Sequence, residues 1–178
     1  MNRISFIAPL ALTAAALAGC QTMAEDMPAA PLGQATIYAA DGRPVGTAKL
    51  VAAGDGVSLA ATLTGLPPGT HAVHLHTSGK CDAPKFTTAG GHLNPAMHEH
   101  GKENPRGAHF GDLPNAQVSA NGSASISADL PGGKDMVVNT IYDTDGTAIV
   151  VHEKADDYRT DPTGNAGDRI ACGVFEAH

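Results

Sequence analysis

The sequence of 178 residues lacks three features that each mark a common class of protein. It has no basic excess: 11 lysines and arginines stand against 18 acidic residues, a formal net charge of −7. This balance argues against a nucleic-acid partner, because phosphate binding needs clustered positive charge. The apolar run at residues 4–18 is shorter than the roughly 18–20 residues that a bilayer core requires, so it does not predict a membrane span. The chain also lacks sustained helical periodicity, which argues against a helical bundle.

The N-terminus has the pattern of an export signal. One cation, Arg3, precedes the apolar run, which ends in Leu-Ala-Gly before Cys20. This ending resembles the lipobox of bacterial lipoproteins, in which the cysteine is acylated and becomes the mature N-terminus. We therefore expect a signal peptide at 1–19, a lipid on Cys20, a tether rich in Ala and Pro at 20–33, and one domain at 34–178. The alternative is a plain signal peptide cut nearby.

An acylated Cys20 predicts a place in the bacterial cell envelope. Several acyl chains on one residue anchor a domain stably to a membrane surface, whereas one chain alone is marginal. Gln21, rather than Asp, after the acylated cysteine favours the outer membrane. The expected location is therefore the periplasm, with the domain held on a membrane.

Only three cysteines are present, and a lipid on Cys20 would leave Cys81 and Cys172. An even pair in an exported chain predicts one disulfide. Two free thiols are the alternative, which an oxidising compartment disfavours.

Short β-prone runs separated by Gly, Pro and Asp turns predict an all-β sandwich or barrel. Asn121-Gly122 lies between two such runs and is a strong hairpin signal. The expected strands are 35–40, 46–52, 57–64, 116–120, 123–128, 147–152 and 170–175. Residues 77–113 and 153–168 fit no strand, and loops of such length are usually functional or disordered.

Histidine is abundant in a chain with no tryptophan and 4% aromatic residues, and the stretch "GTHAVHLHTSGKC" holds three of the nine. If residues 72–76 are extended, His74 and His76 share one face, and His71 points to the other. Two imidazoles two residues apart on a strand can share a metal. His71 is then expected to be a buried imidazole bonded to backbone.

Further candidate ligands lie in the first long segment and at the end of a later apolar run: His92, His98, His100, His109, Asp112 and His152. Imidazoles with one carboxylate and no free thiolate suit zinc or copper rather than a cysteine-type structural zinc site. The sequence therefore predicts metal binding.

Five segments, "GTHAVHLHTSGKC", "AGGHLNP", "GAHFGDLPN", "VVHEKADD" and "GNAGDRIACGV", resemble copper/zinc superoxide dismutase, in its bacterial exported branch. The resemblance covers the chain from about residue 34 to the C-terminus. It implies an eight-stranded Greek-key β-barrel, flattened like a sandwich, with two long functional loops. It departs from the family at Ala72-Val73, where Gly-Phe is usual.

The resemblance implies a copper site and a zinc site that share one histidine, and it names their residues. Copper takes His74, His76, His92 and His152, while zinc takes His92, His100, His109 and Asp112. His92 is then an imidazolate that bridges the two metals. The family spacing selects His100 rather than His98 for zinc, although His98 offers the same chemistry two residues away.

Three further roles follow from the resemblance. Asp156 links the copper ligand His74 to the zinc ligand His100, Cys81 and Cys172 form the disulfide, and Arg169 guides the anion. The implied reaction is dismutation of superoxide to O₂ and H₂O₂ by a copper that changes oxidation state, with His92 supplying a proton.

The net charge of the mature chain, −8 without Arg3, is unfavourable for an anionic substrate. The local field at the site, rather than the total charge, sets the encounter rate. Arg169 is the expected centre of a positive funnel, to which other cations would contribute: Lys154, Arg159, Lys102 and Arg106.

Two other functions were compared with the dismutase. A lipid-anchored copper or zinc store without turnover would be expected to lack a ligand or Arg169, and this chain has both. A zinc hydrolase needs an open zinc position, whereas four protein ligands would close the implied site. The sequence leaves open whether the protein is a monomer or a homodimer.

Overall fold

Ten short strands and one helix make up the part of the chain that the structure, a computed structural model, describes: residues 31–177. The helix α1 spans Lys134–Ile141, and a single 3-10 turn, η1, spans Thr87–Ala89. The strands are β1 (Pro31–Ala39), β2 (Pro44–Ala53), β3 (Gly56–Leu63), β4 (Gly69–His71), β5 (Val73–His76), β6 (Ala116–Val118), β7 (Ala124–Leu130), β8 (Ala148–His152), β9 (Arg169–Val174) and β10 (Glu176–Ala177).

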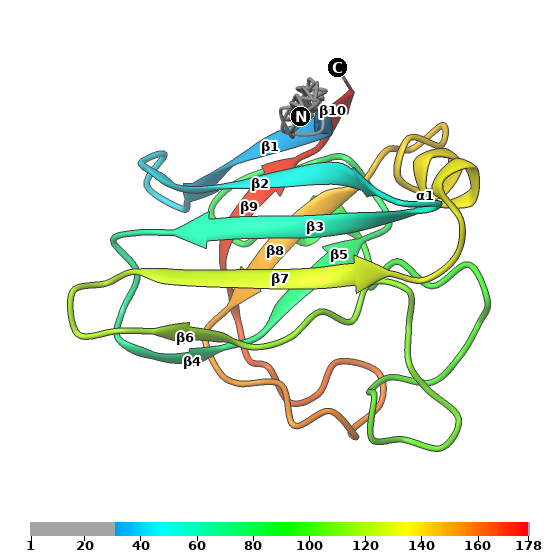
Figure 1. The fold of residues 1–178 in the computed structure, drawn as a ribbon. Helices are drawn as coiled ribbons and strands as arrows, with labels where there is room; N and C mark the ends of the chain where they lie inside the picture. The colour runs from blue at the N-terminus through cyan, green and yellow to red at the C-terminus, as the bar shows by residue number, and fades with distance from the viewer. Residues whose placement is uncertain (1–30, 178) are drawn as a thin grey trace, which may run out of the picture.

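The strands form a curled antiparallel sheet (Figure 1). Its order is β5-β8-β9-β1-β2-β3-β7, β10 pairs with β1, and β4 pairs with β6. Only Ala72 separates β4 from β5, and only Phe175 separates β9 from β10, so each pair is one interrupted strand and the barrel has eight. Neighbours far apart in sequence, such as β3 with β7 and β9 with β1, give the Greek-key connectivity. The predicted eight-stranded Greek-key barrel is confirmed.

Alternation along the strands separates an apolar core from a second, histidine-bearing face. In β5, Val73 and Leu75 are fully buried in the main core. In β8, Ile149 and Val151 face the same core, whereas Val150 and its neighbour Ala148 pack against Phe86, Ala89 and Cys172. All five residues of β8 are buried, because the loop after β5 covers its outer side. We call this side the outer face of β5 and β8.

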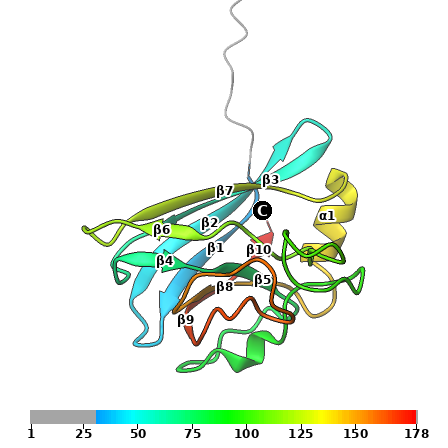
Figure 2. The same ribbon diagram turned by 90° about the horizontal axis from the view of Figure 1, so that it is seen from below.

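The two long loops predicted from the sequence lie next to each other at one end of the barrel (Figures 1 and 2). The first long loop is residues 77–113 and the second is residues 153–168. They are hydrogen-bonded directly, since the Glu103 N–H donates to the Tyr158 carbonyl at 3.0 Å. The barrel thus brings together two segments that are separated by 39 residues in the chain, 114–152.

Several elements differ from the sequence-based expectation. α1 was not predicted, because its buried residues Val137 and Ile141 make a single i, i+4 pair, too short for a periodic signal. β4 and β10 were not predicted either, and both are very short. β1 begins at Pro31, so the last three residues of the predicted tether, 31–33, belong to the first strand.

The predicted signal peptide, the acylated Cys20 and most of the tether lie outside the described residues, as does His178. Among residues 31–177, no helix has the length and apolar character needed to cross a bilayer.

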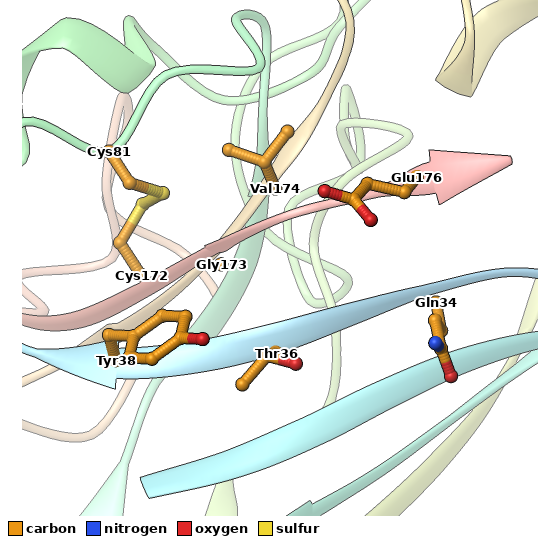
Figure 3. Close-up of a pocket in the computed structure, with 8 residues that line it drawn as sticks. All are labelled: Gln34, Thr36, Tyr38, Cys81, Cys172, Gly173, Val174 and Glu176. Atoms are coloured by element: carbon orange, nitrogen blue, oxygen red, sulfur yellow. A yellow bond between two sulfur atoms is a disulfide. The ribbon is translucent and has the colours of Figure 1, made fainter. Parts of the chain in front are cut away.

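A disulfide joins Cys81 in the first long loop to Cys172 in β9, with a Cα–Cα distance of 5.7 Å. The pairing predicted from the cysteine count is confirmed. A cavity of about 390 Å³ lies beside it, bordered by β1 and β9 and lined by Tyr38, Thr36 and Glu176 among others (Figure 3). The bond closes a loop with a sequence separation of 91 residues, and it pins the covering loop to the barrel.

Replacing both cysteines by alanine should lower the free energy of unfolding by about 4–5 kcal/mol. The crosslink closes a long loop and so restricts the conformational entropy of the unfolded chain, and removing the crosslink restores that entropy. Denaturant unfolding of the double variant and the oxidised wild type measures the difference. The single Cys81→Ala variant is the control, because it also breaks the crosslink and should account for most of the loss. An unchanged midpoint in the double variant would contradict the expectation.

Candidate metal centre

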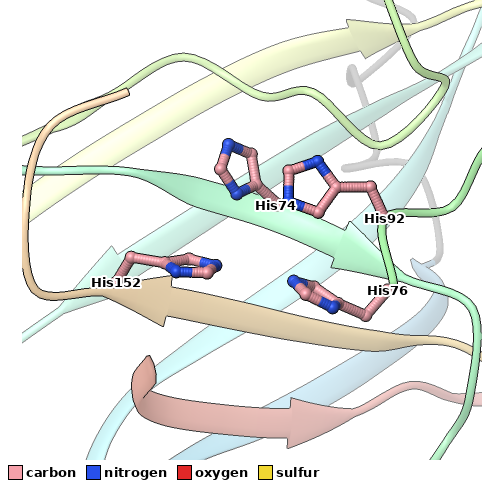
Figure 4. Close-up of side chains that lie close together, drawn as sticks. All are labelled: His74, His76, His92 and His152. Carbon is pink, nitrogen blue, oxygen red and sulfur yellow. The ribbon is translucent and has the colours of Figure 1, made fainter. Parts of the chain in front are cut away.

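The outer face of β5 and β8 carries three histidines whose positions follow from strand geometry. His74 and His76 lie two residues apart in β5, paired opposite Val150 and Ala148 of β8. His152 ends β8 on the same face (Figure 4). The structure therefore places His74 and His76 on one face of β5, as the sequence predicts.

The first cluster adds His92 from the first long loop to these three, and each of the four offers a nitrogen within 4.8 Å of the others. The His92 ring lies 4.0 Å from the His74 ring and 5.0 Å from the His76 ring, between centroids. Figure 4 shows the four rings converging on one point.

Each imidazole of the first cluster keeps one nitrogen without a hydrogen-bond partner in the described structure. These buried atoms are His74 Nδ1, His76 Nε2, His92 Nε2 and His152 Nε2. The opposite nitrogens are engaged: His76 Nδ1 donates to the Gly90 carbonyl at 3.0 Å, and His152 Nδ1 donates to the Gly167 carbonyl at 3.3 Å. These bonds place the proton away from the centre, so the inward nitrogens present lone pairs, as metal ligation requires.

Burial keeps three of the four imidazoles, those of His74, His76 and His152, neutral. It lowers the pKa of His74 to about 4, of His76 to about 2 and of His152 to about 3, because charged imidazolium is poorly solvated there. Three imidazoles that burial keeps neutral lie beside His92, and all four rings turn an unpartnered nitrogen inward, which fits a metal such as copper.

The second cluster is built around one carboxylate oxygen, Asp112 Oδ1. The Nδ1 atoms of His92, His100 and His109 lie 3.0, 3.1 and 3.2 Å from it. His109 Nδ1 lies 3.3 Å from His92 Nδ1. Corners of a tetrahedron with metal–ligand bonds of about 2.0 Å lie about 3.3 Å apart, so these four donors fit zinc. His74 also lies near this group, but its Nε2 is bonded to Asp156.

Asp112 is held as an anion. Burial alone would raise its pKa, but hydrogen bonds from His100 and His92 outweigh burial and hold the pKa well below its usual range. Its second oxygen, Oδ2, accepts from the main-chain N–H groups of Gly101 at 2.9 Å and His109 at 3.0 Å. The carboxylate therefore also fixes the loop that carries the second cluster.

Asp156 joins the two clusters behind the ligand atoms. Its Oδ2 accepts from His74 Nε2 at 2.8 Å, and its Oδ1 accepts from His100 Nε2 at 2.9 Å. Asn115 clamps its main chain, accepting from the Asp156 N–H at 2.8 Å and donating to the carbonyl at 2.9 Å. The hydrogen bonds from His100 and His74 outweigh burial and lower the pKa of Asp156. For His100, burial is outweighed in turn by Asp112 and Asp156, which raise its pKa to about 9.

Two glycines let the loops come this close. Gly101 has φ of +100°, and a Cβ there would lie 2.1 Å from the Tyr158 carbonyl oxygen. Gly164 has φ of +62°, and its Cβ would lie 2.0 Å from Asp156 Oδ1 and 2.6 Å from His100 Nε2. Both positions require glycine for conformation and for space.

The remaining two histidines of interest lie outside both clusters. His71 is buried, and its ring nitrogens face the carbonyls of His152 at 2.8 Å and Pro67 at 2.9 Å. This is the backbone-bonded position expected for it. His98 is exposed, with Nδ1 donating to the Ala108 carbonyl at 3.0 Å, so the structure brings His100 rather than His98 into the second cluster.

Arg169 begins β9 and extends under the first long loop. Its guanidinium donates to the carbonyls of Phe86 and Gly90, both at 2.6 Å. Burial lowers its pKa. It lines a cavity of about 230 Å³ together with Pro84, Lys85, Thr87, Gly167 and Asp168.

The other cations expected in the funnel are mostly engaged elsewhere. Arg159 pairs with Glu103 at 2.7 Å, Arg106 pairs with Glu99, and the Lys102 ammonium lies 3.8 Å from the centre of the Tyr158 ring. Lys85, which the sequence analysis missed, lines the Arg169 cavity instead. Its position four residues after Cys81, which the disulfide ties to β9, is the one sequence feature that could have placed it near Arg169.

Comparison with known proteins identifies the family. The model of the family "Copper/zinc superoxide dismutase (SODC)" matches residues 45–175. The chain belongs to the copper/zinc superoxide dismutases. It is 41% identical over 141 residues to "Superoxide dismutase [Cu-Zn] 1" of Aquifex aeolicus, covering 76% of this chain and 82% of that protein. It is 40% identical over 150 residues to "Superoxide dismutase [Cu-Zn]" of Caulobacter vibrioides, covering 80% of this chain and 84% of the relative.

A solved structure has a similar fold. A double mutant of a SOD-like protein from Bacillus subtilis superposes with a TM-score of 0.74 at 39% identity, covering 79% of this chain and 95% of that one. The predicted activity, an oxidoreductase that dismutates superoxide, and the predicted cofactors, copper and zinc, are thereby confirmed.

Gly164→Ala should weaken the connection between the clusters. A methyl group there collides with Asp156 and His100 in a strained backbone conformation, so we expect destabilisation of about 1–3 kcal/mol and a lower zinc content. Thermal unfolding and elemental analysis measure both effects. Gly91→Ala is the matched control, because nothing lies within 4 Å of a Cβ at Gly91. Equal stability and zinc content in the two variants would refute the role given to Gly164.

Proposed function

We propose that this dismutase works through a copper site and a zinc site that share His92 as a bridging imidazolate. The copper ligands are His74, His76, His92 and His152, and the zinc ligands are His92, His100, His109 and Asp112. One observation supports the bridge most directly. His92 Nε2 is buried and unpartnered in the first cluster, while its Nδ1 lies 3.0 Å from Asp112 Oδ1 in the second.

The reaction converts two superoxide anions and two protons into O₂ and H₂O₂. Copper, when bound, supplies the change of oxidation state, while zinc is redox-inert and fixes the shared ligand. His92 is the residue that we assign to proton delivery. Its Nε2 accepts a proton when it is free, its Nδ1 stays against Asp112, and the Nε2 proton then passes to the reduced substrate.

Asp156 supports this chemistry by holding two ligand rings through the nitrogens that point away from the clusters. By accepting from His74 Nε2 and His100 Nε2, it fixes the tautomers that leave Nδ1 of both rings facing the clusters. It thereby sets the distance between the two ligand groups, although it contacts neither substrate nor the shared imidazole.

Arg169 is assigned to binding the anion. Its guanidinium is held in place by two carbonyls, and a cavity leads to it past Lys85. Lys85 and Arg169 stand against one acidic residue, Asp168, in the cavity lining, so its formal charge is positive and raises the local potential for an anion even though the whole chain is acidic. Lys85 therefore replaces Arg159 in our account of the funnel.

We also propose that the enzyme acts in the bacterial cell envelope, anchored through a lipid on Cys20. The support is a short apolar leader that ends in Leu-Ala-Gly-Cys, together with the Cys81–Cys172 disulfide, a bond that oxidising compartments favour. Gln21 favours the outer membrane. Incorporation of a labelled fatty acid into the protein tests the anchor, and the label should be absent from Cys20→Ala.

Metal analysis combined with a superoxide-dismutation assay on the purified protein tests the function. One copper and one zinc per chain with high activity are expected. His92→Ala should lose activity, because it removes the ligand that the copper and zinc sites share. His98→Ala should keep its activity and both metals, because His98 is exposed and outside the clusters. Zinc alone, with no activity after copper loading, would instead identify a metal-binding protein without turnover.

Arg169→Glu should retain both metals but slow turnover about tenfold or more, because it replaces an attractive charge beside the substrate by a repulsive one. The dependence of rate on salt should also invert, with turnover rising as salt screens the new repulsion. Lys49→Glu, an exposed change on β2, is the control for net charge. A rate and a salt dependence equal to those of the wild type would reject the role of Arg169.

A further inference from the structure

A second carboxylate, Asp161 of the second long loop, reaches the second cluster from the side opposite Asp112. Its Oδ1 accepts a hydrogen bond from the main-chain N–H of His100 at 2.6 Å. The same oxygen lies 3.9 Å from His109 Nε2. One oxygen atom thus faces two histidines of the second cluster, from a loop about fifty residues further along the chain.

The turn that carries Asp161 has hydrogen bonds of its own, centred on Asp157. Asp157 accepts from the N–H and the hydroxyl of Thr160 at 2.8 and 2.6 Å, and from the Asn165 side chain at 2.8 Å. These hydrogen bonds lower the pKa of Asp157 to about 2, so it remains an anion at neutral pH. The position of Asp161 therefore follows from its own loop.

The orientation of His109 makes the position of this carboxylate meaningful. His109 Nδ1 points to the centre of the second cluster, 3.2 Å from Asp112 Oδ1, and Nε2 is the nitrogen nearest Asp161. If Nδ1 binds a metal ion, a neutral ring carries its proton on Nε2. When Nδ1 gives its lone pair to a dication, the Nε2–H end becomes more positive, and a nearby carboxylate stabilises it. At 3.9 Å this attraction is electrostatic rather than a hydrogen bond. The Asp161 side chain is 47% exposed, so water screens part of it.

We propose that Asp161 is a positioning residue for the zinc site. It anchors the main chain of His100, and it balances the charge that develops on His109. The inference rests on the proposed assignment of His100 and His109 as zinc ligands. The contact of Asp161 with the site is separate from that of Asp156. Asp156 accepts hydrogen bonds from Nε2 of His100 and Nε2 of His74.

Zinc affinity of the full protein, measured by competition with a chromophoric chelator, tests the inference. Asp161→Ala removes both contacts and should weaken zinc binding about 10–100-fold, the usual effect of losing a partner of a metal ligand. Asp161→Asn retains an oxygen that can accept from the His100 N–H but removes the charge, so its affinity should fall between those of Asp161→Ala and the wild type. Absorption of the cobalt(II)-substituted proteins reports any change in ligand geometry.

Glu103→Gln is the matched control. It breaks another contact between the same two loops, the Glu103–Arg159 ion pair, at a residue that contacts none of the clustered histidines. Its zinc affinity should stay within about twofold of the wild type, in line with the small worth of exposed ion pairs. A wild-type affinity in Asp161→Ala, or an equal loss in Glu103→Gln, would overturn the proposal. A wild type that binds no zinc would instead refute the ligand assignment itself.

Discussion

The hydrogen bonds of one buried carboxylate, Asp156, hold the site together. Its two oxygens accept from one ring of each cluster, His74 of the first and His100 of the second. A buried carboxylate is costly unless it is fully hydrogen-bonded. The two imidazoles and the N–H of Tyr158 donate to the carboxylate, and the absence of a side chain at Gly164 leaves it space. Asn115 holds the main chain of Asp156 in place. Much of the second long loop is therefore arranged around this one anion.

The barrel and the first long loop each supply part of the two histidine clusters. β5 and β8 supply three imidazoles on a rigid surface whose reverse side is the apolar core. The first long loop supplies the rest and is fixed at several points: the disulfide, Asp112 with its two main-chain contacts, and Arg169 with its two carbonyls. An irregular segment can present ligands accurately because so many of its polar groups are bonded, a requirement for any buried stretch of backbone.

Much of this arrangement could be predicted from the sequence, for definite reasons. Strand parity placed His74 and His76 together, and turn residues marked most of the strands. The choice of His100 over His98 needed the family spacing, because both have the same chemistry and the loop has no periodicity. Asp161 and Lys85 escaped prediction, since their roles depend on how two loops fold onto each other. α1 escaped because two buried residues make no pattern.

The alternation in β5 links stability and chemistry in a way that limits how the strand can change. Val73 and Leu75 face the core, while His74 and His76 face the metals. A slip of one residue in the pairing with β8 would exchange the two sets, exposing apolar side chains to the loops and burying imidazoles in the core. Insertions or deletions within this strand are therefore excluded. A substitution in β5 is tolerated only where it respects the face, core or metal cluster, to which that side chain points.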